Sequence, residues 1–264
     1  MARKTAGTGR KTRYFDIALQ CAARISLEFT EPFERALRIM EDSARHVFVT
    51  GRAGTGKSTL LAHFTETTAK QVAVLAPTGV AAVNVGGQTI HSFFGFRPDV
   101  TPETAKKKLR DADAAIYRKL DAIVIDEVSM VRADLMDCVD AFLRVNGPVK
   151  GAPFGGLQMI LIGDLYQLPP VVGSAEKMLF KTLYPSPYFF SARVFEGLEM
   201  EFVELEKIYR QQDDRFIELL NAIRNRTVTE EDLALLNTRV DADFEPPADE
   251  YYIHLTSTND LADR

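Results

Sequence analysis

Residues 51–58 carry glycines, a lysine and a hydroxyl at a spacing that suits phosphate binding. The segment reads Gly-Arg-Ala-Gly-Thr-Gly-Lys-Ser and fits the pattern G-x-x-x-x-G-K-[ST]. Glycines let consecutive backbone N–H groups turn inward around an anion. Lys57 adds a positive charge for the outer phosphates, and the Ser58 hydroxyl suits a magnesium ion. The alternative is an ordinary glycine turn.

The segments around this loop predict the elements that would position it. Residues 46–50 are apolar enough for a buried strand, and residues 57–68 are compatible with a helix whose positive end faces the phosphates. Strand, loop and helix in this order are what the phosphate-binding pattern requires.

Further short apolar runs predict a parallel sheet. The expected strands are 46–50, 72–76, 122–126 and 158–162, and nearly continuous apolar runs are typical of strands covered on both faces. Helical stretches near 57–68, 102–119 and 131–145 would serve as crossovers. Thr30 and Pro32 predict the start of an entry helix that ends near Asp42. The fold class is therefore α/β, a mostly parallel sheet flanked by helices.

Two carboxylates follow the third apolar run. Asp126 and Glu127 would lie at the carboxyl edge of the sheet, where doubly wound folds bind ligands. Asp126 can hold a magnesium ion directly or through water, and Glu127 can accept a proton from an attacking water.

Two later residues, Gln167 and Arg210, suit a phosphate site, although each could also have no functional role. Gln167 follows the fourth apolar run, and its amide can sense a terminal phosphate or orient water. Its loop contains prolines and could simply leave the core. Arg210 could stabilise developing phosphoryl charge, but it is one of 32 basic residues.

The loops at 76–82 and 86–94 carry small residues, hydroxyls, a histidine and paired aromatics. Such loops can bind single-stranded DNA, because N–H groups and threonines take phosphates while rings stack on bases. The alternative is that Phe93, Phe94 and Phe96 belong to the core and that His91 is a satisfied polar residue.

The composition is that of an ordinary globular chain of 264 residues with a net charge of −5. This charge excludes a globally basic nucleic-acid coat, so DNA contacts must come from a local groove. No apolar run approaches a membrane span. Cys21 and Cys138 form no metal-binding pattern and favour a reducing compartment.

Residues 1–28 are predicted to be an extension, basic at its start and helical at 14–28. The basic start can be a solubilising tail, an arm that touches phosphates or a transit peptide. Residues 29–205 would form one domain and 206–264 the beginning of a second, with a strand at 251–255. Because the chain stops at Arg264, we expect a fragment of a longer protein.

Together these segments resemble the PIF-type, RecD-like DNA helicases of superfamily one. The resemblance covers about residues 30–264, and its motifs are 47–51, 76–82, 87–93, 125–131, 163–171 and 205–211, with a further match at 255–259. It implies a RecA-like P-loop NTPase, the first of two motor domains, which moves 5′-to-3′ along single-stranded DNA with ATP and Mg²⁺.

The resemblance also implies residue roles. Lys57, Glu127, Gln167 and Arg210 would be catalytic, and Ser58 and Asp126 would bind the metal. Candidate DNA contacts are Pro77, Thr78, Gly79, His91 and Phe93. The residues expected to bind ATP are Gly51, Ala53, Gly54, Thr55, Gly56, Lys57, Ser58 and Thr59.

Two departures from the family pattern concern function. Phe33 stands where family members usually carry a glutamine that reads adenine, which argues against adenine selectivity by that route. The later motifs of the second motor domain are missing, so the family's activity belongs more securely to a longer parent protein. A nucleotide-binding switch or assembly module, or a different P-loop machine such as a clamp loader or exonuclease subunit, remains an alternative.

The expected partners are single-stranded DNA and DNA junctions, without a membrane and with a monomer as the expected state. The expected roles are DNA repair, recombination or telomere and genome maintenance. A bacterial protein would be cytoplasmic and associated with the nucleoid; a eukaryotic one would be nuclear or mitochondrial.

Overall fold

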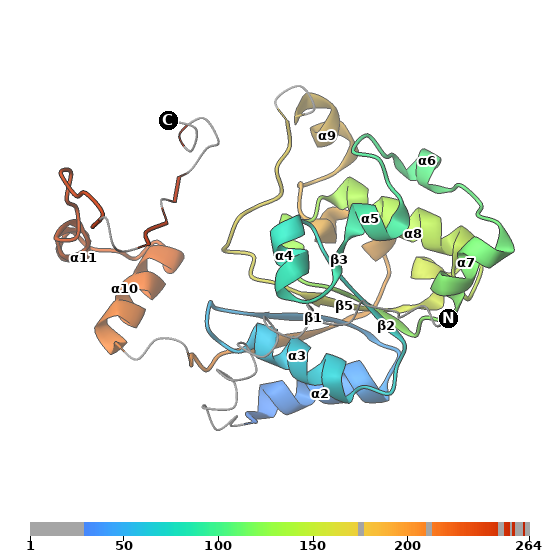
Figure 1. The fold of residues 1–264 in the computed structure, drawn as a ribbon, viewed down its shortest axis with the longest axis horizontal. Helices are drawn as coiled ribbons and strands as arrows, with labels where there is room; N and C mark the ends of the chain where they lie inside the picture. Colours follow the sequence, from blue (N-terminus) through green and yellow to red (C-terminus); the bar gives the residue numbers. More distant parts are fainter. Residues whose placement is uncertain are drawn as a thin grey trace, which may run out of the picture. The chain divides into compact units, whose positions relative to one another are not determined.

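The computed structural model describes residues 29–173, 177–209, 213–247, 251–253, 255–256 and 261 (Figure 1). Two compact units emerge, Met1–Gln211 and Gln212–Arg264. The expected domain limits at 28 and 205 stay a prediction. The helix expected at 14–28 lies outside the described residues.

A six-stranded sheet in the order β3-β2-β4-β5-β1-β6 forms the centre of the first unit, and every described pairing is parallel. Its strands are β1 His46–Gly51, β2 Val72–Ala76, β3 Gln88–Thr89, β4 Ala122–Ile125, β5 Gln158–Ile162 and β6 Met200–Leu205. The four predicted strands and the α/β class are confirmed. The two edge strands, β3 and β6, were not predicted.

Helices cover both faces of this sheet. Figure 1 shows α2 and α3 on one face and α4, α5, α7 and α8 on the other. The helices of this unit are α2 Glu31–Asp42, α3 Lys57–Thr67, α4 Gly79–Asn84, α5 Ile90–Phe94, α6 Pro102–Ala105, α7 Asp111–Arg118, α8 Ala133–Asn146 and α9 Lys177–Leu183. The entry helix is confirmed: Thr30 is its N-cap, and Pro32 lies in its first turn.

Alternate residues of the central strands point to two separate cores. One core contains Val47 and Val49 of β1 together with Leu60 and Phe64 of α3. The other contains residues of β2, β4, β5 and α8, including Ile123. Burial on both faces explains why these strands are continuously apolar.

The helical stretch expected near 102–119 is confirmed only in part, because it consists of two helices, α6 and α7, separated by a loop. The buried side chain of Asn146 accepts a hydrogen bond from the Leu109 N–H (2.9 Å) and donates one to the Lys107 carbonyl (3.0 Å). These bonds take backbone groups that a continuous helix would need for itself. The expected helix at 131–145 is α8, preceded by a 3-10 turn, η1 Val128–Met130.

The second unit contains α10 Asp214–Asn225 and α11 Glu230–Asn237. The strand expected at 251–255 is wrong for the residues described there: 251–253 and Leu255 have no regular secondary structure and are exposed. A strand needs a neighbour to satisfy its backbone groups, and an apolar pattern cannot supply one. Among the described helices of both units, none is long and apolar enough to cross a membrane.

Candidate active site

The phosphate loop connects β1 to α3 through three glycines with positive φ angles. Gly54 has φ 80° and Gly56 has φ 93°, and Gly56 is the N-cap of α3. Gly51 has no room for a side chain, because an added Cβ would lie 2.5 Å from the Leu205 carbonyl oxygen and 2.6 Å from Thr55 Oγ1. The loop is thus packed closely against β6. It leads into the N-terminus of α3, where helices bind anions.

Lys57 is held over this loop. Its Nζ donates hydrogen bonds to the carbonyl oxygens of Gly51 (2.8 Å) and Arg52 (3.0 Å). These bonds hold the ammonium group against the phosphate loop. Ser58 is exposed and Thr59 is half-buried in the first turn of α3, while Thr55 is buried and Ala53 is exposed.

Asp126 lies at the same sheet edge as the phosphate loop. It follows β4, and β5 lies between β4 and β1, so the two are about 10 Å apart at two strand spacings. Asp126 is buried, and burial together with the neighbouring Glu127 charge raises its pKa to about 6, although a backbone hydrogen bond and the Lys57 charge oppose this shift. A cation beside this carboxylate would favour its charged form.

Glu127 has an unusual backbone conformation. Its φ of 50° and ψ of 41° place it in the left-handed region, which non-glycine residues adopt at a cost of about 1–2 kcal/mol. Strain of this kind is concentrated at functional sites. The turn separates the Glu127 side chain, which is half-buried, from that of buried Asp126.

The loop after β5 carries Gln167 and is ordered by a neighbouring carboxylate. Asp164 is buried and accepts hydrogen bonds from the Tyr166 N–H (3.1 Å) and the Gln167 side-chain amide (3.4 Å). Gln167 itself is exposed. Sequence reasoning missed Asp164 as a positioning residue, although an aspartate two residues before a backbone donor is a common turn signal.

Arg210 lies outside the described residues, but the residue before it in the chain contacts the phosphate loop. The Tyr209 N–H donates a hydrogen bond to the Gly54 carbonyl oxygen (2.8 Å). A Cβ added at Gly56 would lie 3.9 Å from the Tyr209 ring. The segment that leads to Arg210 is thus attached to the phosphate loop, a contact that sequence spacing could not reveal.

The candidate DNA contacts follow two neighbouring strands. Thr78 caps α4 after β2, accepting a hydrogen bond from the Ala81 N–H (3.2 Å), and His91 lies in α5 after β3. Since β2 and β3 are parallel neighbours, both residues lie at one sheet edge. Pro77 is half-buried and Gly79 is exposed, whereas burial lowers the pKa of His91.

The aromatic residues of this region pack in or against the core. Phe94 is buried, and Phe93 and Phe96 are partly buried against the same core. The Phe93 ring contacts the Tyr117 ring with centroids 5.4 Å apart. Phe93 therefore has a core role, and its DNA role stays a prediction.

Phe33, which stands at the usual glutamine position, is a core residue. Only 3% of it is exposed, and its ring meets the Phe29 ring edge-on. A buried phenyl ring has no hydrogen-bonding group for a nucleobase.

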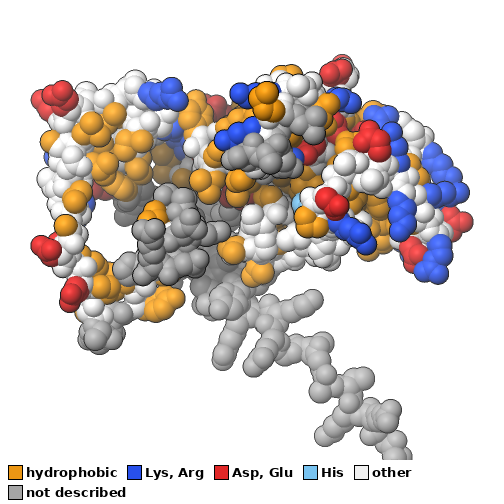
Figure 2. All heavy atoms as spheres, turned by 90° about the horizontal axis from the view of Figure 1, so that it is seen from above, with side chains coloured by type: hydrophobic (Ala, Val, Ile, Leu, Met, Phe, Trp, Pro, Cys, Tyr) orange, Lys and Arg blue, Asp and Glu red, His pale blue; other side chains and the backbone are white. Residues whose placement is uncertain are grey.

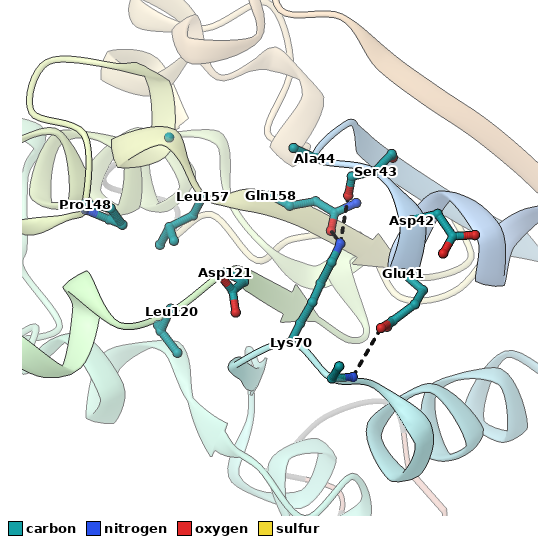
Figure 3. A pocket seen from close by; sticks show the side chains of 12 residues that line it. Glu41, Asp42, Ser43, Ala44, Lys70, Leu120, Asp121, Pro148, Leu157 and Gln158 are labelled. Atoms are coloured by element: carbon teal, nitrogen blue, oxygen red, sulfur yellow. Dashed lines mark hydrogen bonds between the residues drawn. The ribbon is translucent and has the colours of Figure 1, made fainter.

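A separate pocket of about 590 Å³ lies at the opposite, amino-terminal edge of the sheet (Figure 3). In it, Lys70 Nζ donates to the carbonyl oxygens of Met40 (2.6 Å) and Ser43 (2.7 Å) and to Gln158 Oε1 (2.7 Å). Burial lowers the Lys70 pKa, against the opposing effect of Glu41 and other carboxylates. These bonds join the end of α2 to the sheet, so Lys70 serves the fold rather than the phosphate site.

Known proteins resemble this chain in sequence and in fold. Residues 28–234 match the family described as PIF1-like helicase. The chain belongs to this family. It is 34% identical over 204 residues to the ATP-dependent DNA helicase RRM3 of Saccharomyces cerevisiae, covering 74% of this chain and 27% of RRM3. It is 36% identical over 223 residues to the ATP-dependent DNA helicase PIF1 of Danio rerio, covering 83% of this chain and 33% of the relative.

Among solved structures, the Bacteroides Pif1 helicase in complex with ADP-AlF3 and single-stranded DNA is similar at a TM-score of 0.82 and 38% identity. That match covers 90% of this chain and 56% of the other. The RecA-like fold and the family are thereby confirmed. The chain spans about a third or less of the two curated relatives, and the individual site residues stay predictions.

Proposed function

We propose that this chain contains the first motor domain of an ATP-dependent DNA helicase that translocates 5′-to-3′ on single-stranded DNA. The observation that carries the proposal is the convergence of the phosphate loop, the Asp126–Glu127 pair and the Gln167 loop at one edge of a parallel sheet. Catalysis of phosphoryl transfer depends mainly on positioning and charge stabilisation, which these groups can supply.

In the proposed reaction, the phosphate loop binds the nucleotide and Lys57 stabilises charge on the outer phosphates. Glu127 accepts a proton from the attacking water, while Gln167 orients that water or contacts the terminal phosphate. Arg210 would add positive charge in the transition state.

The donor set at the loop fits magnesium. Ser58 and Asp126 are hard oxygen ligands, and magnesium needs only one or two of these beside substrate phosphates and water. The described residues hold no group of three or more histidine, cysteine or acidic side chains suited to a metal ion, so the substrate phosphates would complete the coordination. Magnesium would neutralise phosphate charge, and this chain's residues would position it.

DNA is the proposed partner of the loops that carry Pro77, Thr78, Gly79, His91 and Phe93. Single strands and junctions are the expected substrates, with repair, recombination or telomere and genome maintenance as the setting. We further propose a monomer, located in the bacterial nucleoid or in a eukaryotic nucleus or mitochondrion.

The test is ATPase activity with and without single-stranded DNA, on this chain and on a longer chain that continues past Arg264. A motor is expected to be stimulated many-fold by DNA in the longer chain, and Lys57→Ala should abolish turnover. Arg38→Ala is a matched control, because Arg38 is exposed and its ion-pair partner Glu34 is exposed as well. Nucleotide binding without DNA stimulation in the longer chain would instead indicate a switch or assembly module.

A further inference from the structure

A strongly basic face lies on the first unit, away from the phosphate loop. Residues 106–119 contain six basic and two acidic residues, a net charge of +4 in a chain of net −5. Lys and Arg side chains gather at the right of Figure 2, where Figure 1 places α6 and α7. We call Lys106, Lys107, Lys108, Lys119 and nearby Lys150 the lysine face, and all five are exposed.

The backbone that carries three of these lysines is fixed. Asn146 is 1% exposed and holds the loop by its hydrogen bonds to Lys107 and Leu109, and it also donates to the Phe142 carbonyl (3.1 Å). Ala105, just before the lysines, is buried. An ordered backbone lowers the conformational entropy that binding must overcome.

The acidic groups of this face are paired with arginines. Arg110 binds Asp113 (2.8 Å), and Arg118 binds Asp111 (2.9 Å). Lys108 and Lys150 are near enough to Asp111 to contribute to its lowered pKa, after the dominant effect of Arg118. Within the described ranges, no carboxylate lies at ion-pair distance from any lysine of the face, so their charges point to an anionic partner.

The side chains near these lysines indicate whether the face suits single-stranded or double-stranded DNA. The exposed large apolar residues nearby are Ile116 and Val149, and the aromatic Tyr117 is only 7% exposed. Single-stranded DNA is generally bound through rings that stack on bases, whereas a duplex offers mainly its phosphates. A cationic face without exposed aromatic rings therefore suits the backbone of double-helical DNA.

The lysine face is joined to the loops proposed to bind single-stranded DNA. The Tyr117 hydroxyl in α7 donates a hydrogen bond to the Phe93 carbonyl oxygen in α5 (2.8 Å), and the two rings are in contact. From this continuity we infer that the lysine face binds phosphates of the duplex next to the single strand at a DNA junction. This inference rests on the proposed function.

The experiment compares Lys106→Ala/Lys107→Ala/Lys108→Ala with Arg35→Ala/Arg38→Ala/Arg45→Ala. Both triple variants remove three positive charges, and the control arginines lie on or just after α2, across the sheet, in exposed ion pairs. Fluorescence anisotropy would measure the binding of a blunt DNA hairpin and of single-stranded oligothymidine over a range of salt concentrations, using the whole chain.

The lysine variant should bind the hairpin more weakly. Its plot of log affinity against log salt concentration should be less steep by up to about 2.7, or about 0.9 for each lost phosphate contact. Oligothymidine binding and DNA-stimulated ATPase in the longer chain should persist. An unchanged hairpin slope, an equal loss for oligothymidine, or an equal loss in the arginine control would each overturn the inference. Absence of DNA-stimulated ATPase in the unmodified longer chain would instead overturn the proposed function.

Discussion

Glu127→Gly is expected to stabilise the fold while ending hydrolysis. The left-handed conformation of Glu127 costs about 1–2 kcal/mol for a residue with a Cβ. Glycine removes that cost but gains freedom in the unfolded chain, which offsets about 0.5–1 kcal/mol. The net gain in the free energy of unfolding is therefore about 0–1.5 kcal/mol, which is a rise of up to about 6 °C in melting temperature for a domain of this size.

Two variants separate the backbone effect from the charge effect. Glu127→Gln keeps the Cβ and the left-handed backbone but removes the charge that raises the Asp126 pKa. Glu66→Gly lies at an exposed position within α3, where glycine should destabilise by about 1 kcal/mol. The expected order of stability is Glu127→Gly above Glu127→Gln, with Glu66→Gly below the unmodified chain.

Urea unfolding followed by circular dichroism suits this chain, which contains no tryptophan. ATPase measured on the longer chain should be lost in both Glu127 variants, while ADP binding is retained. If Glu127→Gly were as destabilising as Glu66→Gly, the Glu127 backbone would not be strained in the folded chain. If ADP binding were lost as well, Glu127 would have a structural role.

Three further perturbations follow from the site geometry. Gly51→Ala should lower the free energy of unfolding in urea by more than about 2 kcal/mol, because the added Cβ would clash with the Leu205 carbonyl oxygen. Gly79→Ala is the control and should be nearly neutral, because no atom of the described residues lies within contact distance of a Cβ added there. Asp126→Asn should stabilise the nucleotide-free chain at pH 7.5 but not at pH 4. Burial raises the Asp126 pKa to about 6, so the ionised carboxylate destabilises the folded state. This destabilisation develops as pH rises from about 4 to 6 and reaches at most about 3 kcal/mol. An equal effect at both pH values would contradict this. Asp164→Ala should lower kcat without weakening ADP binding, because the Gln167 loop loses its acceptor; unchanged kcat would exclude this positioning role.

The central strands could be predicted because they are buried on both faces and have no polar alternation. The edge strands could not: β3 has two residues, and β6 has three half-buried or exposed residues before Val203. The break within the helical stretch expected near 102–119 could not be predicted for a related reason. Asn146 is distant in the sequence and forms hydrogen bonds to the backbone at Lys107 and Leu109, which the local sequence pattern does not predict.

The sequence by itself determined the family, the phosphate loop and the carboxylates after β4, because fixed residue types at short spacing carry that chemistry. Tertiary structure decided which groups act on one another. It placed Asp126 near enough to Lys57 for the lysine charge to act on its pKa, brought the Tyr209 N–H to the Gly54 carbonyl, and packed Phe93 partly against the core. The physical reason is that strand order, backbone hydrogen bonds and burial bring together residues that are far apart in the chain. A sequence motif contains only residues that are close along the chain.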